Sequence, residues 1–366
     1  MKGSVLEHVV PGVLAINPYR PGKPLEELER EYGITDSIKL ASNENPTGPS
    51  PAALMAAQES LASVRLYPDG NGFELKKKLA DKLSVSPDQI TLGNGSNDVL
   101  DFVVRCFAGP GDEVIVPEYG FLMFQLMTLA VGAKPVVVPA VEWGADLDGM
   151  LQAVTPRTRV VFLANPNNPT GSWCDRTALN RFLQALPSDI LLVLDEAYFE
   201  YVSDPDYPDG LEWLAAFPNL MVTRTFSKAH GLAGLRIGYG VSSVEIAELL
   251  NRIRPPFNVS VPAQAAAVAA LDDGEHLQRA VAVNRVGLAR LAGGFDEIGL
   301  VFIPSVANFL AVAVPNAAQV YEKLLHAGVI VRPLANYGMP NHLRISVGTE
   351  LENSRCLTAL KQILAS

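Results

Sequence analysis

Residues that would point to a metal site or a disulfide scaffold are scarce in this sequence. Its 366 residues include only 3 cysteines and 5 histidines, and both types are scattered along the chain. Cys106, Cys174 and Cys356 are odd in number and far apart, so they form neither a disulfide framework nor the spacing of a zinc ribbon. We therefore expect no structural disulfide and no protein-bound metal.

Long apolar runs are also missing. No segment reaches about 18 apolar residues without a charge or a helix breaker, as a membrane-spanning helix requires. The N-terminal stretch MKGSVLEHVVPGVLAINPY is interrupted by Glu7, His8 and Pro11, so it lacks the continuous apolar core of a signal peptide. We expect a cytoplasmic protein without a membrane partner.

Basic residues are outnumbered, with 29 Lys and Arg against 39 Asp and Glu and a formal net charge of −10. This balance argues against a nucleic-acid partner, whose phosphates attract basic proteins. Apolar residues, by contrast, make up 48% of the chain, which is ample for packed cores. Because the length exceeds what one core usually supports, we expect two domains and small-molecule ligands.

Short apolar runs alternate with helical patterns from residue 86 onward. Strands are predicted in QITLGN, DEVIVP and KPVVVP, with helices over 97–107 and 121–130 between them. This alternation is typical of βαβ units that build a parallel sheet. Further buried strands are predicted in RVVFLAN, DILLVLDEA, NLMVTRTFS and LRIGYGV. Ligands of such sheets bind at the carboxyl ends of the strands.

The pattern changes after PPFNVSVP. An Ala-rich helix in AQAAAVAALDD and a helix over 279–292 precede two strand-like runs, NFLAVAV and HLRISVG, which flank the helical QVYEKLLHAG. The first forty residues are too short to fold alone and are expected to dock on this second part. The predicted α/β protein thus has a large domain with a mostly parallel sheet, residues 45–258, and a smaller α/β domain built from 1–44 and 259–366.

The first candidate site is the turn in LGNGSNDVLDF, where a predicted strand ends and a helix begins at Ser96 or Asn97. Free backbone N–H groups at a helix start, together with the positive end of its dipole, bind phosphate. Such turns are common, so a simple N-cap by Ser96 remains an alternative.

A second candidate is Asp195, at the end of the apolar run DILLVLD. A carboxylate there needs a partner, because an unpaired buried charge is costly. The partner of Asp195 is either a bound cation or another part of the protein, as in a structural ion pair or a loop cap. Tyr198 in the following turn lies close to the same strand end.

Lys228 lies in TRTFSKAHGLAGLRIGYG, among hydroxyls, glycines and apolar residues. Partial desolvation there would lower its pKa toward that of a nucleophilic amine. Thr225, Ser227 and Arg236 in the same segment suit a phosphate. Taken alone, such a lysine is more often an ordinary surface residue. Asn168 in LANPNNPTG follows another strand, where a Pro-stiffened turn is the alternative explanation.

GNGSND, NPNNPTG, DEAY and SK with GLRIGY occur in this order, and together they resemble the motifs of fold type I aminotransferases that use pyridoxal phosphate. Over nearly the whole chain, segments such as KLASNENPTGPSP and LYPDGNGFELKKKLA most resemble histidinol-phosphate aminotransferases of class II. Aromatic amino-acid aminotransferases share many segments and remain an alternative. A pyridoxal-phosphate decarboxylase or lyase, or a non-catalytic binding protein, are alternatives of other classes.

The resemblance implies a role for each motif residue. Lys228 would carry pyridoxal phosphate as a Schiff base and shuttle the substrate proton, Asp195 would pair with the pyridine nitrogen, and Tyr119 would stack on the ring. The other cofactor ligands would be Asn168 and Tyr198 at the phenolic oxygen and, around the phosphate, Gly95, Ser96, Asn97, Thr225, Ser227, Arg236 and, from the second subunit of a homodimer, Tyr67.

The resemblance also implies a substrate site. Arg344 in HLRISVG would bind the anionic end of the substrate, and its planar fork clamps carboxylate and phosphate equally well. Arg332, Tyr19 and Asn43 are weaker candidates for contacts with the substrate. The implied reaction moves an amino group between histidinol phosphate and the pair 2-oxoglutarate and glutamate, as a step of histidine biosynthesis.

Overall fold

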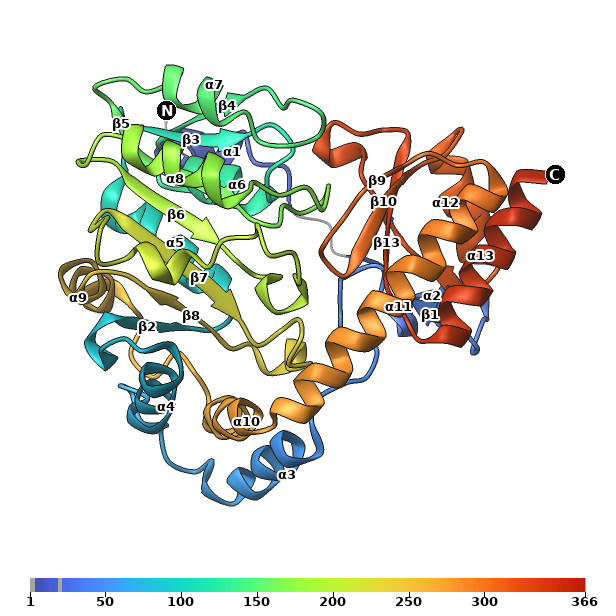
Figure 1. Ribbon diagram of the computed structural model, residues 1–366, viewed down its shortest axis with the longest axis horizontal. Helices are drawn as coiled ribbons and strands as arrows, with labels where there is room; N and C mark the ends of the chain where they lie inside the picture. Colours follow the sequence, from blue (N-terminus) through green and yellow to red (C-terminus); the bar gives the residue numbers. More distant parts are fainter. Residues whose placement is uncertain (1–3, 19–21, 366) are drawn as a thin grey trace.

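The computed structural model describes residues 4–18 and 22–365, which form a larger and a smaller α/β part lying side by side (Figure 1). The larger part is built on a seven-stranded sheet in the order β2-β8-β7-β6-β5-β3-β4. All neighbours pair parallel except β8, which runs against both β2 and β7. The strands are β2 (Ile90–Gly93), β3 (Glu113–Pro117), β4 (Lys134–Val138), β5 (Thr158–Ala164), β6 (Leu191–Asp195), β7 (Leu220–Thr225) and β8 (Gly238–Val241).

Helices cover both faces of this sheet, as a mostly parallel sheet with buried faces requires. Every residue of β6 and β7 is buried, which explains why both strands begin with apolar runs and carry polar residues only toward their carboxyl ends. One face packs on α3 (Pro51–Ser60), α4 (Phe73–Leu83), α7 (Leu147–Gln152), α8 (Arg176–Ala185) and α10 (Val261–Asp272). The other face packs on α5 (Ser96–Phe107), α6 (Leu122–Ala130) and α9 (Val244–Ile253).

The smaller part has a four-stranded antiparallel sheet in the order β12-β13-β10-β9. The long helix α11 (Gly274–Ile298) runs from beside α10 across to this sheet (Figure 1). The strands are β9 (Phe302–Ile303), β10 (Phe309–Ala313), β12 (Arg332–Pro333) and β13 (His342–Ser346), and the remaining helices are α12 (Ala317–His326) and α13 (Glu350–Ala365). The short 3-10 helices of the chain are η1 (Val5–His8), η2 (Leu61–Ser63), η3 (Pro87–Gln89), η4 (Phe199–Tyr201), η5 (Gly210–Trp213), η6 (Ala233–Leu235) and η7 (Ala335–Tyr337).

The N-terminal segment contacts both parts. The strand β1 (Ile38–Lys39) pairs parallel with β11 (Val329–Ile330), and α2 (Leu25–Tyr32) buries Leu28 in the same region. The short helix α1 (Pro11–Leu14) packs instead on α6 of the larger part. The predicted α/β fold with a mostly parallel sheet is confirmed by this architecture. The division at residues 44/45 and 258/259 stays a prediction, and α10, which lies beyond its second boundary, packs on α3 and α4.

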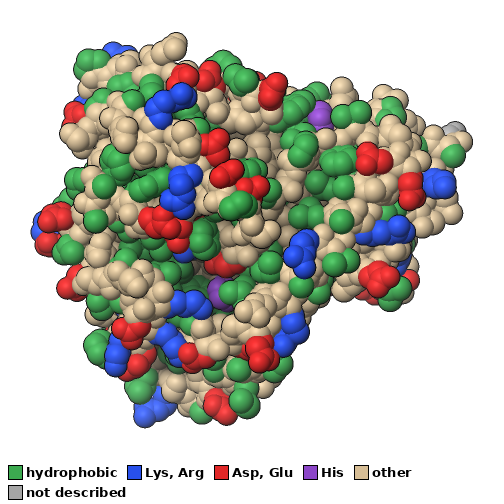
Figure 2. Space-filling view, viewed as in Figure 1, with side chains coloured by type: hydrophobic (Ala, Val, Ile, Leu, Met, Phe, Trp, Pro, Cys, Tyr) green, Lys and Arg blue, Asp and Glu red, His purple; other side chains and the backbone are tan. Residues whose placement is uncertain are grey.

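Within residues 4–18 and 22–365, no helix is both long enough and apolar enough to cross a membrane. The described residues also contain no group of three or more His, Cys, Asp or Glu that could hold a metal ion. The three cysteines are free thiols. On the face shown in Figure 2, acidic and basic side chains are interspersed rather than gathered into a basic patch.

The stability of the larger part should depend on an aromatic stack between helix and sheet. Phe124 on α6 and Phe162 on β5 are fully buried and stack with ring centroids 4.6 Å apart. Phe162→Ala leaves a cavity there and should lower the free energy of unfolding by about 3–5 kcal/mol, measured in urea. The control Leu351→Ala, at a position that is 83% exposed, should change it by less than about 0.5 kcal/mol. Similar losses in both variants would contradict this account of the core.

Candidate active site

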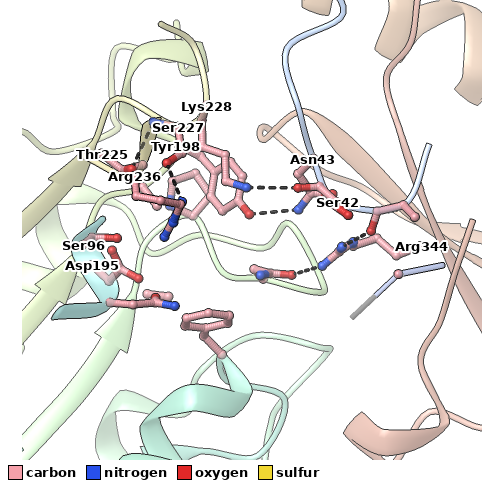
Figure 3. A pocket seen from close by; sticks show the side chains of 18 residues that line it. Ser42, Asn43, Ser96, Asp195, Tyr198, Thr225, Ser227, Lys228, Arg236 and Arg344 are labelled. Carbon is pink, nitrogen blue, oxygen red and sulfur yellow. Dashed lines mark hydrogen bonds between the residues drawn. The ribbon is translucent and has the colours of Figure 1, made fainter. Parts of the chain in front are cut away.

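A pocket lies at the carboxyl ends of β5, β6 and β7, where the smaller part meets the larger sheet (Figure 3). This is the position at which open α/β sheets bind ligands. It brings together most of the predicted site residues from segments far apart in the sequence. The lining residues are Gly22, Ala41, Ser42, Asn43, Ser96, Asn97, Phe121, Ala164, Pro166, Asn168, Asp195, Ala197, Tyr198, Thr225, Ser227, Lys228, Arg236 and Arg344.

One end of the pocket has the features of a phosphate cradle. The helix α5 begins at Ser96, and its N-cap is Gly95 rather than Ser96, with no side-chain cap, so the first N–H groups remain for a ligand. Gly95 has φ +85°, and a Cβ there would lie 2.3 Å from Nη2 of Arg236. Glycine is therefore required for the guanidinium to approach the helix start.

Two hydroxyl residues complete this end of the pocket. Thr225 is the last residue of β7, and Ser227 follows in the next turn. Nη1 of Arg236 donates a hydrogen bond to Oγ of Ser227 at 3.3 Å. The hydroxyls, the guanidinium and the helix start thus converge on one small volume. Such a set of donors suits a phosphate dianion.

Asp195 ends β6 with its side chain in the pocket and only 5% of the residue exposed. The hydroxyl of Thr223 donates to its Oδ1 at 2.9 Å. Burial raises the pKa of Asp195 to about 6, while the Thr223 hydroxyl and the charge of Lys228 oppose that rise. A cation bound in the pocket would complete the compensation of this buried carboxylate.

Lys228 extends into the same pocket. Its Nζ donates to the carbonyl oxygen of Ser42 at 3.1 Å and lies 5.7 Å from the centroid of the Tyr198 ring. Burial, and next the charge of Arg344, lower the pKa of Lys228 to about 8. The neutral, nucleophilic amine is therefore much more populated near neutral pH than in an ordinary lysine.

The side of the pocket toward the smaller part is held by a chain of hydrogen bonds. Nδ2 of Asn43 donates to the hydroxyl oxygen of Tyr198 at 2.8 Å, and Oγ of Ser346 donates to Oδ1 of Asn43 at 2.8 Å. Asn43 therefore links the phenol to strand β13 of the smaller part. Burial strongly raises the pKa of Tyr198, which keeps its hydroxyl protonated and able to donate to a ligand.

Arg344 lies on β13 and is also buried. Its Nη2 donates to the carbonyl oxygen of Ala41 at 2.7 Å, and its Nη1 donates to Oδ1 of Asn168. Its Nε is buried and has no hydrogen-bond partner among the described residues. A guanidinium that lines a pocket and is held in place through both Nη1 and Nη2 is suited to an anionic ligand.

Two predicted aromatic residues are not part of the pocket lining. The ring of Tyr119 lies 5.3 Å from that of Trp143, and Phe121, two residues on, lines the pocket instead. Tyr67 is 81% exposed and stacks on Phe257 with ring centroids 4.7 Å apart. The roles of Tyr119 and Tyr67 toward the cofactor stay predictions.

The weaker substrate candidates have different surroundings. Arg332 is buried on β12, directly opposite Arg344 in the antiparallel pairing, but it does not line the pocket. Asn43 lines the pocket, and its amide is engaged with Tyr198 and Ser346. Tyr19 lies outside the described residues.

Three contributions to the site are not predictable from the sequence, because they come from a backbone atom or from residue types that are ordinary at their positions. The carbonyl oxygen of Ser42 holds Lys228, and no pattern of residue types identifies a backbone acceptor. The resemblance implied a role for Tyr119, and nothing in the sequence distinguishes the nearby Phe121, which lines the pocket, from an ordinary core residue. Thr223 lies inside a buried strand, where a threonine is an ordinary strand residue.

Comparison with known proteins places this site in a family. The model of the family "Aminotransferase class I and II" matches residues 35–361, and the chain belongs to that family. The chain is 53% identical over 368 residues to histidinol-phosphate aminotransferase 2 of Pseudomonas fluorescens, with 100% of both sequences covered. It is 54% identical over 358 residues to histidinol-phosphate aminotransferase 2 of Pseudomonas aeruginosa, covering 97% of each.

A solved structure agrees with these relatives. The crystal structure of histidinol-phosphate aminotransferase from Sinorhizobium meliloti, in complex with pyridoxal 5'-phosphate, superposes with a TM-score of 0.90. The two sequences are 33% identical, and the match covers 99% of both chains. The predicted family and fold are thereby confirmed.

The lowered pKa of Lys228 leads to a pH-dependent prediction. In the cofactor-free protein, acetylation of Lys228 by acetic anhydride should reach half its maximal rate near pH 8, because the neutral amine reacts. Lysines on the surface should do so near their usual value of about 10.4 and serve as internal controls. Removing a nearby positive charge with Arg344→Gln should raise the midpoint for Lys228. A midpoint like that of the surface lysines would show that the amine is not desolvated.

Proposed function

We propose that this protein is a pyridoxal-phosphate-dependent aminotransferase that moves an amino group between histidinol phosphate and the pair 2-oxoglutarate and glutamate. The observation that carries the proposal is the meeting of Lys228 and Asp195 in one pocket, with the phosphate cradle on one side and Arg344 on the other (Figure 3). The named relatives support histidinol phosphate as the donor, because they match this chain along its full length.

The residues of the pocket fit the parts of pyridoxal phosphate one by one. The uncapped start of α5 with Arg236 suits the phosphate, and the incompletely compensated Asp195 suits a protonated pyridine nitrogen. The amine of Lys228 suits the aldehyde carbon, and Tyr198 with the amide of Asn168 suits the phenolic oxygen. When bound, the cofactor supplies an electron-withdrawing ring that stabilises negative charge on the substrate carbon that loses a proton.

The side chains of the pocket have distinct tasks in this reaction. Asp195 keeps a negative charge at the ring nitrogen, and a cationic partner there would lower its pKa again. Lys228 holds the cofactor between turnovers and, as a neutral amine, takes the proton from the amino-bearing carbon of the substrate. The hydroxyl of Tyr198, whose oxygen accepts a hydrogen bond from Asn43, would donate a hydrogen bond to the phenolic oxygen.

Arg344 binds the anionic end of each substrate in turn, the phosphate of histidinol phosphate or a carboxylate of glutamate. Arg332 on the neighbouring strand adds positive charge near that end, which favours the more highly charged phosphate. Asn43 and Tyr19 would contribute to the wall around the substrate. Tyr119 would stack on the cofactor ring, although Phe121 rather than Tyr119 lines the pocket.

The active form is proposed to be a homodimer, with Tyr67 of one subunit reaching the cofactor phosphate of the other. Tyr67 lies in an exposed apolar region with Val64, Leu66 and Phe257, which are 56%, 58% and 44% exposed. An apolar patch of this kind is expected to be covered by a protein partner. We place the enzyme in the cytoplasm, in line with a biosynthetic role.

Covalent labelling tests the cofactor assignment. Borohydride reduction in the presence of pyridoxal phosphate should attach the cofactor permanently to Lys228, because its amine is the nucleophile of the pocket. Peptide mass analysis should find the label there in the wild type, and Lys228→Arg should take up none at the site. A label on another lysine in the wild type would overturn the assignment.

A comparison of amino donors tests the substrate. With 2-oxoglutarate as acceptor, kcat/KM for histidinol phosphate should exceed that for phenylalanine and tyrosine. Arg344→Lys should lower kcat/KM for every anionic donor by about tenfold to a hundredfold, because Lys cannot reproduce the forked contact.

Arg332→Ala separates phosphate recognition from general binding of anions. It should reduce kcat/KM for histidinol phosphate selectively if the phosphate interacts with this second cation. Equal losses for histidinol phosphate and phenylalanine would remove the phosphate-specific role of Arg332. A wild-type preference for phenylalanine would favour an aromatic amino-acid aminotransferase. Product formation without 2-oxoglutarate would instead indicate a decarboxylase or lyase.

A further inference from the structure

Asp195 is held by a neighbour that does not itself line the pocket. In the parallel pairing of β6 and β7, Asp195 lies directly beside Thr223. The Thr223 hydroxyl donates to Oδ1 of Asp195 at 2.9 Å, and Thr223 is completely buried. Thr225, two residues along β7 and on the same face of the strand, lines the pocket. Thr223 therefore does not line the pocket itself but contacts Asp195, which does.

The orientation of Thr223 is fixed by its two neighbouring strands. On the side of β8 it pairs with Gly240, and a Cβ on Gly240 would lie 3.7 Å from Cγ2 of Thr223. The methyl group thus faces β8, and the hydroxyl faces Asp195 on β6. An ionised carboxylate only accepts hydrogen bonds, so the hydroxyl must act as the donor to it.

We propose that Thr223 is a positioning residue: its hydroxyl occupies Oδ1 of Asp195 and so presents the second carboxylate oxygen to the ring nitrogen of the cofactor. The proposal rests on the proposed function, because the proposed function identifies the ring nitrogen as the partner of the second carboxylate oxygen. The contact also favours the ionised carboxylate, and it is the largest of the influences that oppose the burial-driven rise in the pKa of Asp195.

Cofactor affinity provides the first measurement. Thr223→Val keeps the shape and the methyl contact with β8 but removes the donor, and it should raise the Kd for pyridoxal phosphate about tenfold, in line with the loss of a hydrogen bond to a charged group. Thr223→Ser keeps the hydroxyl and should bind within about twofold of the wild type. In an Asp195→Ala background, Thr223→Val should have no further effect.

The matched control is Thr91→Val. Thr91 is a completely buried threonine of the same sheet, on β2, and its Oγ1 has no hydrogen-bond partner among the described residues. This variant should leave the Kd unchanged. Its Tm also gives the effect on stability of replacing a buried threonine of this sheet by valine when no hydrogen bond is lost.

The cofactor-free full-length chain provides the second measurement. Because the folded pKa of Asp195 lies above its unfolded value of 3.8, this residue makes the protein lose stability as the pH rises from about 4 to about 6. Without the hydroxyl the folded pKa rises further, and the loss extends above pH 6. The Tm of Thr223→Val, relative to Thr91→Val, should therefore fall by a further amount on the order of 1–2 °C between about pH 5 and about pH 8.

Other titrating groups near Asp195 are present in every variant compared. Lys228 and Tyr198 face it across the pocket, and Glu196 follows it in the chain. Burial raises the pKa of Glu196 too, so only the difference between variants reports on Asp195.

The outcomes separate this proposal from the proposed function. An unchanged Kd together with an unchanged pH dependence in Thr223→Val would overturn the positioning role. So would equal weakening by Thr223→Ser and Thr223→Val, because packing rather than the hydroxyl would then hold Asp195. If the wild type takes up no pyridoxal phosphate, the proposed function fails, while the pH comparison on the cofactor-free chain still decides whether Thr223 controls Asp195.

Discussion

The site depends on the parallel register of three central strands. Ala164 at the end of β5 pairs with Asp195 at the end of β6, and Asp195 pairs with Thr223 near the end of β7. Parallel strands end at the same edge of the sheet, so residues about 30 positions apart in the sequence become neighbours. A slip of one residue in β6 would turn Asp195 away from the pocket and bring another side chain there. The burial of β6 and β7 on both faces, with apolar residues at their starts, therefore fixes the position of Asp195 as well as the core.

The smaller part completes the pocket through hydrogen bonds to the N-terminal segment rather than through an apolar contact alone. Arg344 donates to Asn168 of the larger part and to the backbone of Ala41, and Ser346 reaches Tyr198 through Asn43. The segment around residues 41–45 is thus shared by both parts. Movement of the smaller part would shift the anion-binding guanidinium and the contact to the phenol together.

Much of the fold was predictable because it depends on local patterns. Strand positions in the larger part follow from buried apolar runs, but the reversed direction of β8 does not, since its apolar sequence fits either orientation. The helix predicted over 279–292 runs in the structure over Gly274–Ile298. Two of its glycines lie at close contacts with neighbouring elements. A Cβ on Gly287 would lie 2.3 Å from Cγ1 of Val347, and one on Gly294 would lie 2.4 Å from Cδ1 of Leu357.

The adjacent acidic residues Asp195 and Glu196 show why the site itself was only partly predictable. Successive strand residues point to opposite faces, and Glu196 is turned to a buried pair with Arg224, at 2.9 Å and 2.7 Å to Nε and Nη2. The sequence left a structural ion pair open for Asp195, and in the structure Glu196 forms one. Both carboxyls are buried, but Asp195 lines the pocket, whereas Glu196 does not and is paired with Arg224. Because the partner of Glu196 lies 28 residues away on another strand, this difference between the two carboxylates appears only once β6 and β7 are paired.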